Sequence, residues 1–219
     1  MKYVAAFAAG AVMLAALGAF VGGVAWLLLW PALNLALLAL IYYKNDPGLL
    51  GKQGAGRMAP SSVLLFLPYL SLTWVCWFFY VRLSSEPWAH EIADGVWVGR
   101  RPDKDHLPPR GALVVDLTAE FPAAPEVVRN WTYISLPVLE ARAPAVAQVK
   151  VLVARMMSSS QPVYIYCAQG HGRSASLAAG LLVARGVAAD ARAAEARMKE
   201  IRPGIRLHRI QRRIVDAAR

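Results

Sequence analysis

The stretch PVYIYCAQGHGRSASLAAGLLVARG, residues 162–186, decides the fold of this chain. Its first part, 162–166, is rich in β-branched and aromatic residues and predicts a buried strand. Residues 174–185 are rich in Ala and Leu and end before Gly186, which predicts a helix with a glycine cap. A polar loop joins the two segments, so the stretch predicts a strand–loop–helix unit of an α/β fold.

The connecting loop, CAQGHGRS at 167–174, predicts an anion-binding site. Backbone N–H groups in a loop at a helix N-terminus point into one concavity, and the helix dipole adds positive potential there. Glycines allow the backbone to adopt unusual dihedral angles and to come close to a ligand. The loop residues expected to surround the anion are Ala168, Gln169, Gly170, His171 and Gly172.

Three side chains of this loop have chemistry that suits phosphate. Cys167 begins the loop, where N–H groups and a cation stabilise a thiolate, the nucleophilic form of cysteine. Arg173 offers a planar fork to two phosphate oxygens, and Ser174 can donate a hydrogen bond to a departing thiolate. A solvated arginine at a helix start is the alternative, but the dipole disfavours a cation there unless an anion is bound. His171 either contacts substrate, tunes the thiolate or is an ordinary loop histidine.

The remaining pattern from residue 83 onward predicts an α/β domain. Apolar strand-like runs alternate with helical ones, and this alternation favours a mainly parallel central sheet flanked by helices. The expected strands are 95–99, 112–116, 131–136 and 162–166. The expected helices are 144–157, 174–185, 191–201 and 208–218.

Cys-x5-Arg-Ser after an apolar strand and before a helix resembles the cysteine-dependent dual-specificity and protein tyrosine phosphatase superfamily. The likeness extends over about 88–211, through the segments 94–102, 114–120, 133–140 and 195–211, and points to a bacterial membrane-anchored member. It implies a double displacement: the thiolate attacks phosphorus, a carboxylic acid protonates the leaving oxygen, and water hydrolyses the phosphocysteine. It implies no metal and no other cofactor.

Two departures from the family pattern concern the thiolate and the acid. Tyr166 stands where members usually have histidine, directly before the cysteine. Glu140 follows the segment 136–139 at the position where members usually have an aspartic acid, and a longer carboxylic acid can transfer the same proton. We therefore expect Glu140 to be the general acid, with Asp116 and Glu120 as reserve candidates near strand ends.

Two other functions fit parts of this pattern. A pseudophosphatase would bind phosphate through the loop and Arg173 but would not hydrolyse it. The two departures from the family pattern, Tyr166 and Glu140, motivate this alternative. A rhodanese-like enzyme handling sulfur or arsenate would also place a cysteine between a strand and a helix. The Arg-Ser ending of the loop and the segment 114–120 argue against that third function.

The first 82 residues predict a transmembrane region ahead of a phosphatase domain at 83–219. No charged residue occurs from Tyr3 to Tyr43 or from Met58 to Val81. A spanning helix needs about 20 apolar residues, and a signal peptide has a shorter apolar core. The expected spans are 3–20, 24–43 and 61–81, the last with a kink at Pro68.

The composition indicates the partners. A net charge of +10 beside a membrane favours anionic headgroups or phosphorylated substrates, and no recognisable nucleic-acid motif accompanies it. The substrate is expected to be a phosphoprotein (Tyr, Ser or Thr) or a phospholipid. Anchoring favours lipid, whereas the absence of Lys from 167–173 weighs against it.

The oligomeric state is not predicted. Cys76 lies in an apolar run, so no disulfide with Cys167 and no metal site is expected.

The side of the membrane follows from the number of spans. Three spans would put the N-terminus and the domain on opposite sides. Positive charge at Lys2 and in the loop 44–60 would then place the domain in the periplasm. A reactive thiolate instead favours the cytoplasm, where thiols stay reduced. We expect a multi-pass protein of the bacterial inner membrane with a cytoplasmic catalytic domain.

Overall fold

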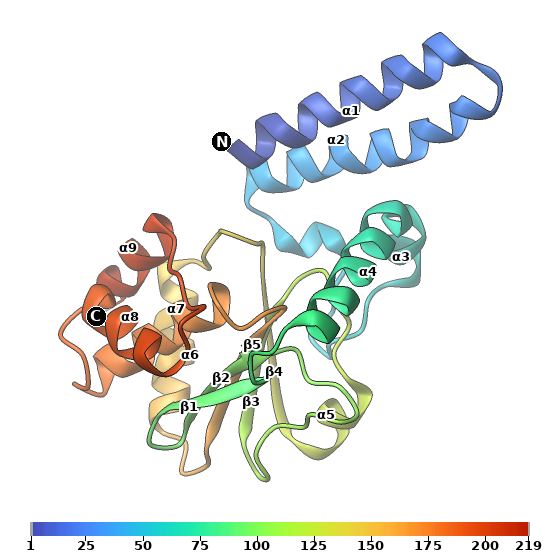
Figure 1. Cartoon of the computed structure of the whole chain (residues 1–219). Helices are drawn as coiled ribbons and strands as arrows, with labels where there is room; N and C mark the ends of the chain where they lie inside the picture. The colour runs from blue at the N-terminus through green and yellow to red at the C-terminus, as the bar shows by residue number, and fades with distance from the viewer. Residues whose placement is uncertain (1, 219) are drawn as a thin grey trace. The chain divides into compact units, whose positions relative to one another are not determined.

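The computed structural model describes residues 2–218, and the chain divides into two compact units (Figure 1). The helical unit comprises Met1–Lys52 and Met58–Ser84. The α/β unit comprises Gln53–Arg57 and Ser85–Arg219, and it holds the loop singled out above.

The helical unit begins with a helical hairpin. Helix α1 (Lys2–Val21) is followed by the 3-10 helix η1 (Gly23–Leu28) and α2 (Leu29–Lys44). By length and composition, Lys2–Val21 and Gly23–Lys44 are both long and apolar enough to cross a membrane. A Cβ added at Gly10 would lie 2.9 Å from Leu35 Cδ1, so a small residue there allows α1 and α2 to pack closely.

The third apolar run differs from the single spanning helix expected over 61–81. After the short 3-10 helix η2 (Pro47–Leu50), the run forms α3 (Pro60–Leu65) and α4 (Leu67–Leu83). The kink expected at Pro68 is therefore a break between two helices. Pro68 explains the break, because it has no N–H for the preceding turn and restricts the residue before it.

Asn34 in α2 satisfies backbone groups that this break leaves without helical partners. Its side chain is 1% exposed. Asn34 Nδ2 donates to Leu65 O at 2.8 Å and to Trp30 O at 3.1 Å, and Oδ1 accepts from Tyr69 N at 3.3 Å. Unpaired polar groups in apolar surroundings are costly, so one asparagine links α2 to both sides of the break.

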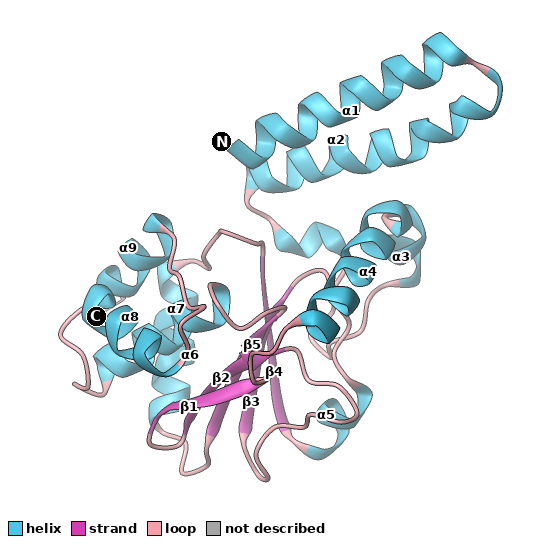
Figure 2. Ribbon diagram, in the orientation of Figure 1, coloured by secondary structure: helices cyan, strands magenta, loops and turns pink. Residues whose placement is uncertain are grey.

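A five-stranded sheet forms the centre of the α/β unit, in the order β1-β2-β5-β3-β4 (Figure 2). Strand β1 runs antiparallel to β2, and the other neighbouring pairs are parallel. The expected α/β class with a mainly parallel sheet is confirmed. The strands are Ala89–Ala93 (β1), Val96–Arg100 (β2), Leu113–Thr118 (β3), Thr132–Val138 (β4) and Val163–Cys167 (β5).

Helices cover both faces of the sheet (Figure 2). Four of them pack on one face around the main core: α6 (Val146–Met157), α7 (Arg173–Ala184), α8 (Ala191–Ile201) and α9 (Arg209–Ala217). Helix α5 (Pro125–Asn130) packs on the other face. Because side chains alternate along a strand, Cys167 at the end of β5 points to the main core, and Tyr166 points to the opposite face.

The broken helix gives a testable expectation. Replacing Asn34 with Leu removes the side-chain acceptor of Tyr69 N and one of two side-chain donors to Leu65 O, the other being Trp30 Nε1 at 3.0 Å. A buried polar group left unsatisfied costs about 1–3 kcal/mol. In detergent, hydrogen exchange of the Tyr69 amide should accelerate in Asn34→Leu. Leu33→Ala, a neighbouring exposed position on α2, should leave that amide unchanged. Equal protection in wild type and Asn34→Leu would show that the asparagine does not hold the break.

Candidate active site

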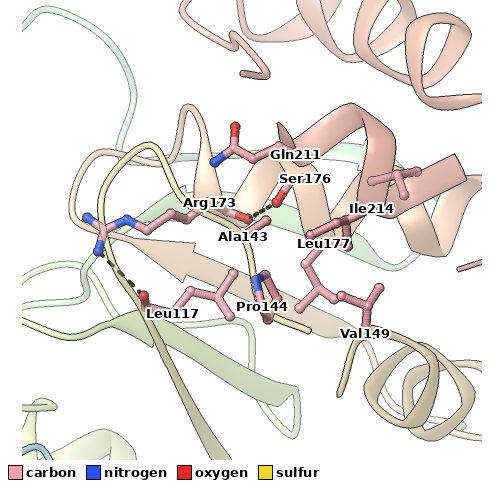
Figure 3. A pocket seen from close by; sticks show the side chains of 10 residues that line it. Leu117, Ala143, Pro144, Val149, Arg173, Ser176, Leu177, Gln211 and Ile214 are labelled. Atoms are coloured by element: carbon pink, nitrogen blue, oxygen red, sulfur yellow. Dashed lines mark hydrogen bonds between the residues drawn. The ribbon is translucent and has the colours of Figure 1, made fainter. Parts of the chain in front are cut away.

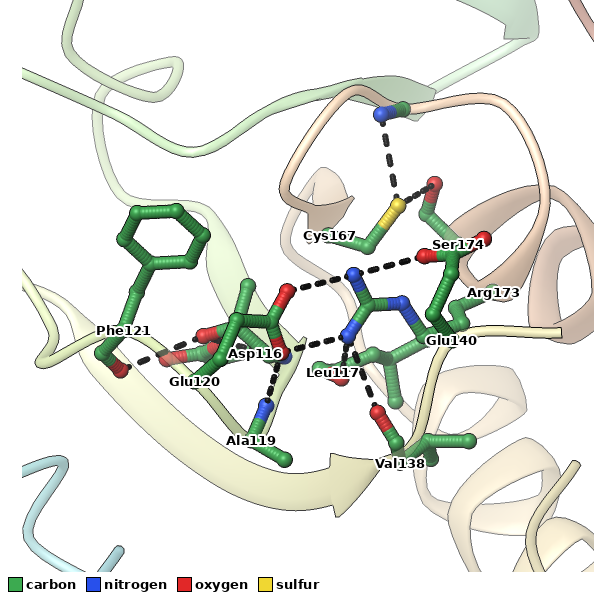
Figure 4. A network of polar contacts seen from close by, with 12 residues as sticks. Asp116, Leu117, Ala119, Glu120, Phe121, Val138, Glu140, Cys167, Arg173 and Ser174 are labelled. Atoms are coloured by element: carbon green, nitrogen blue, oxygen red, sulfur yellow. Dashed lines mark hydrogen bonds and ion pairs between the residues drawn. The ribbon is translucent and has the colours of Figure 1, made fainter. Parts of the chain in front are cut away.

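The loop between β5 and α7 surrounds the sulfur of Cys167 with donors (Figure 4). Cys167 is 3% exposed. Gly170 N donates to Sγ at 3.3 Å, and the Ser174 hydroxyl lies 3.4 Å from the same atom. Hydrogen bonds to a charged form favour it, so this geometry suits a thiolate.

Gly170 is the loop position that requires glycine. Its φ is 81°, in the region that L side chains rarely adopt. A Cβ there would lie 2.5 Å from the carbonyl carbon of Gly99 and 2.6 Å from its oxygen. The loop can therefore pass the end of β2 and present an N–H to the sulfur only with glycine at this position.

Arg173, the first residue of α7, is fixed by carboxylates and carbonyls. It is 2% exposed. Its two terminal nitrogens pair with Glu120: Nη1 with Oε2 at 2.8 Å and Nη2 with Oε1 at 2.7 Å. Nη1 also donates to Val138 O at 2.9 Å, and Nη2 lies 2.9 Å from Glu140 Oε2 (Figure 4). Such a bidentate pair sets the plane of the guanidinium.

The Nε hydrogen of Arg173 differs from the other guanidinium hydrogens. This nitrogen is buried and has no hydrogen-bond acceptor among the residues that the structure describes. Buried donors are almost always paired, so an unpaired one at a candidate site requires an explanation. A phosphate oxygen is an acceptor that suits Nε, whereas Nη2 is already engaged by Glu120 and by the half-exposed Glu140.

The ion pair also determines which groups stay charged. Burial disfavours ionisation of Glu120, but the Arg173 guanidinium outweighs it and lowers the pKa of Glu120 below its usual range. Burial likewise disfavours the Arg173 cation, and the charges of Glu120 and Glu140 outweigh it and raise the pKa of Arg173. Glu120 thus remains a carboxylate and orients the arginine, so it is poorly suited to donating a proton.

The three candidate acids occupy different environments. Glu140 follows β4, and its side chain is 54% exposed beside Arg173. Asp116 is fully buried. Its Oδ1 accepts from Thr118 N and Oγ1 at 2.8 and 2.7 Å, and its Oδ2 accepts from Tyr133 at 2.7 Å. Glu140 is therefore the one of the three that combines exposure with contact to Arg173.

Tyr166, at the position of the family's histidine, does not carry charge to the thiolate. Burial, followed by the nearby charge of Asp116, raises its pKa well above the ordinary value. Its ring packs with Tyr164 at a centroid distance of 5.9 Å on the face opposite Cys167. The tyrosine is therefore a neutral part of the packing beneath the loop.

Two residues behind the loop were missed in the sequence. Arg202 donates from Nε to Gly170 O at 3.1 Å and from Nη2 to Gln169 O at 2.9 Å. Glu86 contacts His171, with Oε2 lying 2.6 Å from Nε2. The side chain of His171 is thus engaged by a carboxylate. The sequence shows Arg202 only as an arginine between the end of a helix and Pro203. That pattern is common, so it does not predict the contacts of Arg202 with the loop.

A small pocket of about 10 Å³ adjoins the backbone of Arg173 (Figure 3). Pro144, Leu177 and Ile214 contribute apolar walls, and Gln211 contributes a polar group. A cavity needs about 10–15 Å³ to hold a single water molecule, so this space is too small for a substrate. The guanidinium of Arg173 points away from the pocket in Figure 3, so we place the chemistry at Cys167 instead.

Within residues 2–218, no three His, Cys, Asp or Glu side chains gather as a metal site.

Comparison with solved structures gives the same fold. The chain resembles PTPMT1 in complex with PI(5)P, with 18% identity, a TM-score of 0.52 and coverage of 60% of this chain and 94% of that one. It resembles Tk-PTP in its active form, with 24% identity, a TM-score of 0.52 and coverage of 60% and 96%. A mouse putative dual specificity phosphatase complexed with zinc tungstate matches at 16% identity and a TM-score of 0.50, with coverage of 62% and 89%. At these identities the likeness establishes the fold.

Sequence comparison gives the family. No curated protein matches the chain significantly. The family model described as "Swiss Army Knife protein, DSP-PTPase phosphatase domain" matches residues 100–215, more than half of the chain. That segment includes the strand β5, the loop from Cys167 to Ser174 and the helix α7. The chain therefore belongs to this DSP-PTPase family and is a cysteine-dependent phosphatase of the dual-specificity type.

Proposed function

We propose that the chain is a membrane-anchored phosphomonoester hydrolase that works through a phosphocysteine on Cys167. The observation that carries the proposal is the buried, unpaired Nε of Arg173 in a loop whose donors surround the sulfur. Arg173 and the loop N–H groups bind the phosphate, Glu140 is the general acid and Ser174 assists the departure of the thiolate. Residues 83–219 form the phosphatase domain, and residues 1–82 form the N-terminal region that contains the anchor.

In the first step, the Cys167 thiolate attacks phosphorus and the bond from phosphorus to the ester oxygen breaks. Glu140 protonates that oxygen, so the alcohol or phenol leaves in neutral form. Negative charge on the transferring phosphoryl group is held by Arg173 and the loop N–H groups. Glu120 keeps the guanidinium in one plane throughout, because both its oxygens bind the arginine.

In the second step, water attacks the phosphocysteine and the sulfur–phosphorus bond breaks. Glu140, now a carboxylate, takes the proton from the water. The Ser174 hydroxyl, 3.4 Å from Sγ, donates a hydrogen bond to the thiolate as it forms again. Inorganic phosphate then leaves, and the enzyme returns to its starting state.

We propose that the anchor is a hairpin of two spans, α1 and η1–α2. Two spans return the chain to the side on which it began, unlike the three spans expected from hydropathy. Lys2 and Lys44 then flank the hairpin on the same side, and the positive-inside rule makes that side the cytoplasm. The phosphatase domain follows on this side, where the thiol of Cys167 stays reduced.

We propose a phosphorylated lipid headgroup as the substrate. An anchored site meets a membrane substrate at high effective concentration. The net charge of +10 favours anionic lipid surfaces, and the structurally similar PTPMT1 has been solved with PI(5)P. A phosphoprotein is the second candidate, because the loop 167–173 contains no lysine to meet extra phosphate charge.

The reaction class is tested with the full chain in detergent and a chromogenic aryl phosphate, in the presence of a metal chelator. Wild type should release phosphate, and Cys167→Ser should fall to background because the nucleophile is lost. The matched control is Cys76→Ser, which removes the other cysteine, on α4, and should retain full activity. Persistent activity in Cys167→Ser would assign the nucleophile elsewhere.

Glu140→Gln tests the general acid. Its kcat for phenyl phosphate should fall by about 100-fold, within the range of general acid catalysis, and the alkaline limb of the pH–rate profile should disappear. The loss should be smaller for p-nitrophenyl phosphate, whose leaving group needs protonation less. Glu126→Gln, at an exposed carboxylate on α5, should match wild type. An unchanged alkaline limb in Glu140→Gln would exclude Glu140 as the acid.

The substrate class is tested with the full chain reconstituted into vesicles that contain a phosphatidylinositol monophosphate. Phosphate release should proceed with a higher kcat/KM than for a soluble phosphotyrosine peptide. It should also exceed release from the water-soluble headgroup alone, since only the lipid shares the membrane with the enzyme. Preference for the peptide would assign a phosphoprotein substrate.

A further inference from the structure

Arg202 orients two peptide groups of the phosphate loop. The carbonyl oxygens of Gln169 and Gly170 both accept from its guanidinium, at 2.9 and 3.1 Å. In a trans peptide the C=O and the following N–H point in opposite directions. With the Gln169 carbonyl turned to Arg202, the N–H of Gly170 faces Cys167 Sγ at 3.3 Å. The same geometry turns the N–H of His171 away from Arg202.

This guanidinium is 1% exposed and depends on a short segment that precedes the sheet. Glu86 Oε2 lies 2.8 Å from Arg202 Nη2, and Pro87 O accepts from Nη1 at 2.8 Å. The ring of His90 lies 3.0 Å from Nη1. Burial and the charge of Arg202 lower the pKa of His90, so His90 serves as a neutral acceptor. Glu86 therefore supplies negative charge to a buried cation, which is costly to leave unpaired.

Glu86 also holds the loop directly. The same Oε2 lies 2.6 Å from Nε2 of His171, whose side chain is 21% exposed. One carboxylate oxygen thus bridges the loop residue and the arginine beneath the loop. Gly204 leaves room for this pair, since a Cβ there would lie 2.5 Å from His171 Nε2 and 3.0 Å from Glu86 Oε1.

We propose that Glu86 is a positioning residue for phosphate transfer, acting through Arg202 and His171. It lies outside the family match at 100–215 and two positions after Ser84, the last residue of the helical unit. The segment that follows the helical unit is therefore part of the proposed phosphatase machinery. The inference rests on the proposed role of the loop, but it concerns how the loop keeps its N–H groups directed at the anion.

The test compares full-length Glu86→Gln with wild type in detergent. A loop that loses its alignment should lower kcat by up to about 100-fold, since small displacements of reacting groups have effects of that size. The inhibition constant for inorganic phosphate should rise as well, because the same N–H groups bind the product. Glu86→Asp keeps the charge at shorter reach and should recover part of both losses. Glu126→Gln should match wild type in both measurements.

The outcomes separate this inference from the proposed function. Wild-type kcat and phosphate inhibition in Glu86→Gln would overturn the positioning role, even if Cys167→Ser is inactive. If Glu86→Gln fails to fold, Glu86→Asp decides. Reduced kcat and weaker phosphate inhibition at an unchanged melting temperature support the proposal, and wild-type values of both contradict it.

Discussion

The ion pair between Arg173 and Glu120 is the interaction on which the site depends. A cation removed from water needs a countercharge and an acceptor for each of its hydrogens. Glu120 supplies two oxygens, Val138 supplies a carbonyl, and Glu140 contacts Nη2 at 2.9 Å. The Nε hydrogen has no acceptor among the described residues, and we propose that an anion binds there. The arrangement keeps the arginine charged, rigid and directed before any substrate arrives, which is the condition for electrostatic catalysis.

The loop that carries Cys167 is fixed by a second buried arginine in a similar way. In the proposed mechanism Arg173 binds the phosphate through its side chain, whereas Arg202 donates to two carbonyls of the loop backbone. Each arginine is matched by a glutamate from a distant part of the chain. The first glutamate, Glu120, follows β3, and the second, Glu86, precedes β1. The sheet brings these pieces together at the carboxyl end of its central strand, where α/β folds usually bind ligands.

Local chemistry explains what the sequence could predict. The strand, loop and helix at 162–186 are contiguous, so their order and the chemistry of Cys167, Arg173 and Ser174 could be inferred directly. The mainly parallel sheet followed from the alternation of apolar runs, although β1 was missed because Ala89–Ala93 contains a histidine and a glutamate.

The contacts of Arg173 with Glu120 and of His171 with Glu86 join residues 53 and 85 positions apart, and no local pattern predicts them. Glu120 was a candidate acid because it lies near a strand end, and only the tertiary structure reveals its ion pair with Arg173. The interruption in the third apolar run was expected as a kink at Pro68, and the structure has it as a break between α3 and α4.

In the proposed mechanism the phosphoryl group passes through Cys167. The most direct measurement is mass spectrometry of the full chain, quenched in acid within milliseconds of mixing with an aryl phosphate that has a good leaving group. Such a substrate makes the first step fast, so the intermediate accumulates before water attacks it. We expect a phosphoryl group on the peptide that contains Cys167 and on no other residue. Turnover with Cys167 unmodified, or with the phosphoryl group on another side chain, would contradict it.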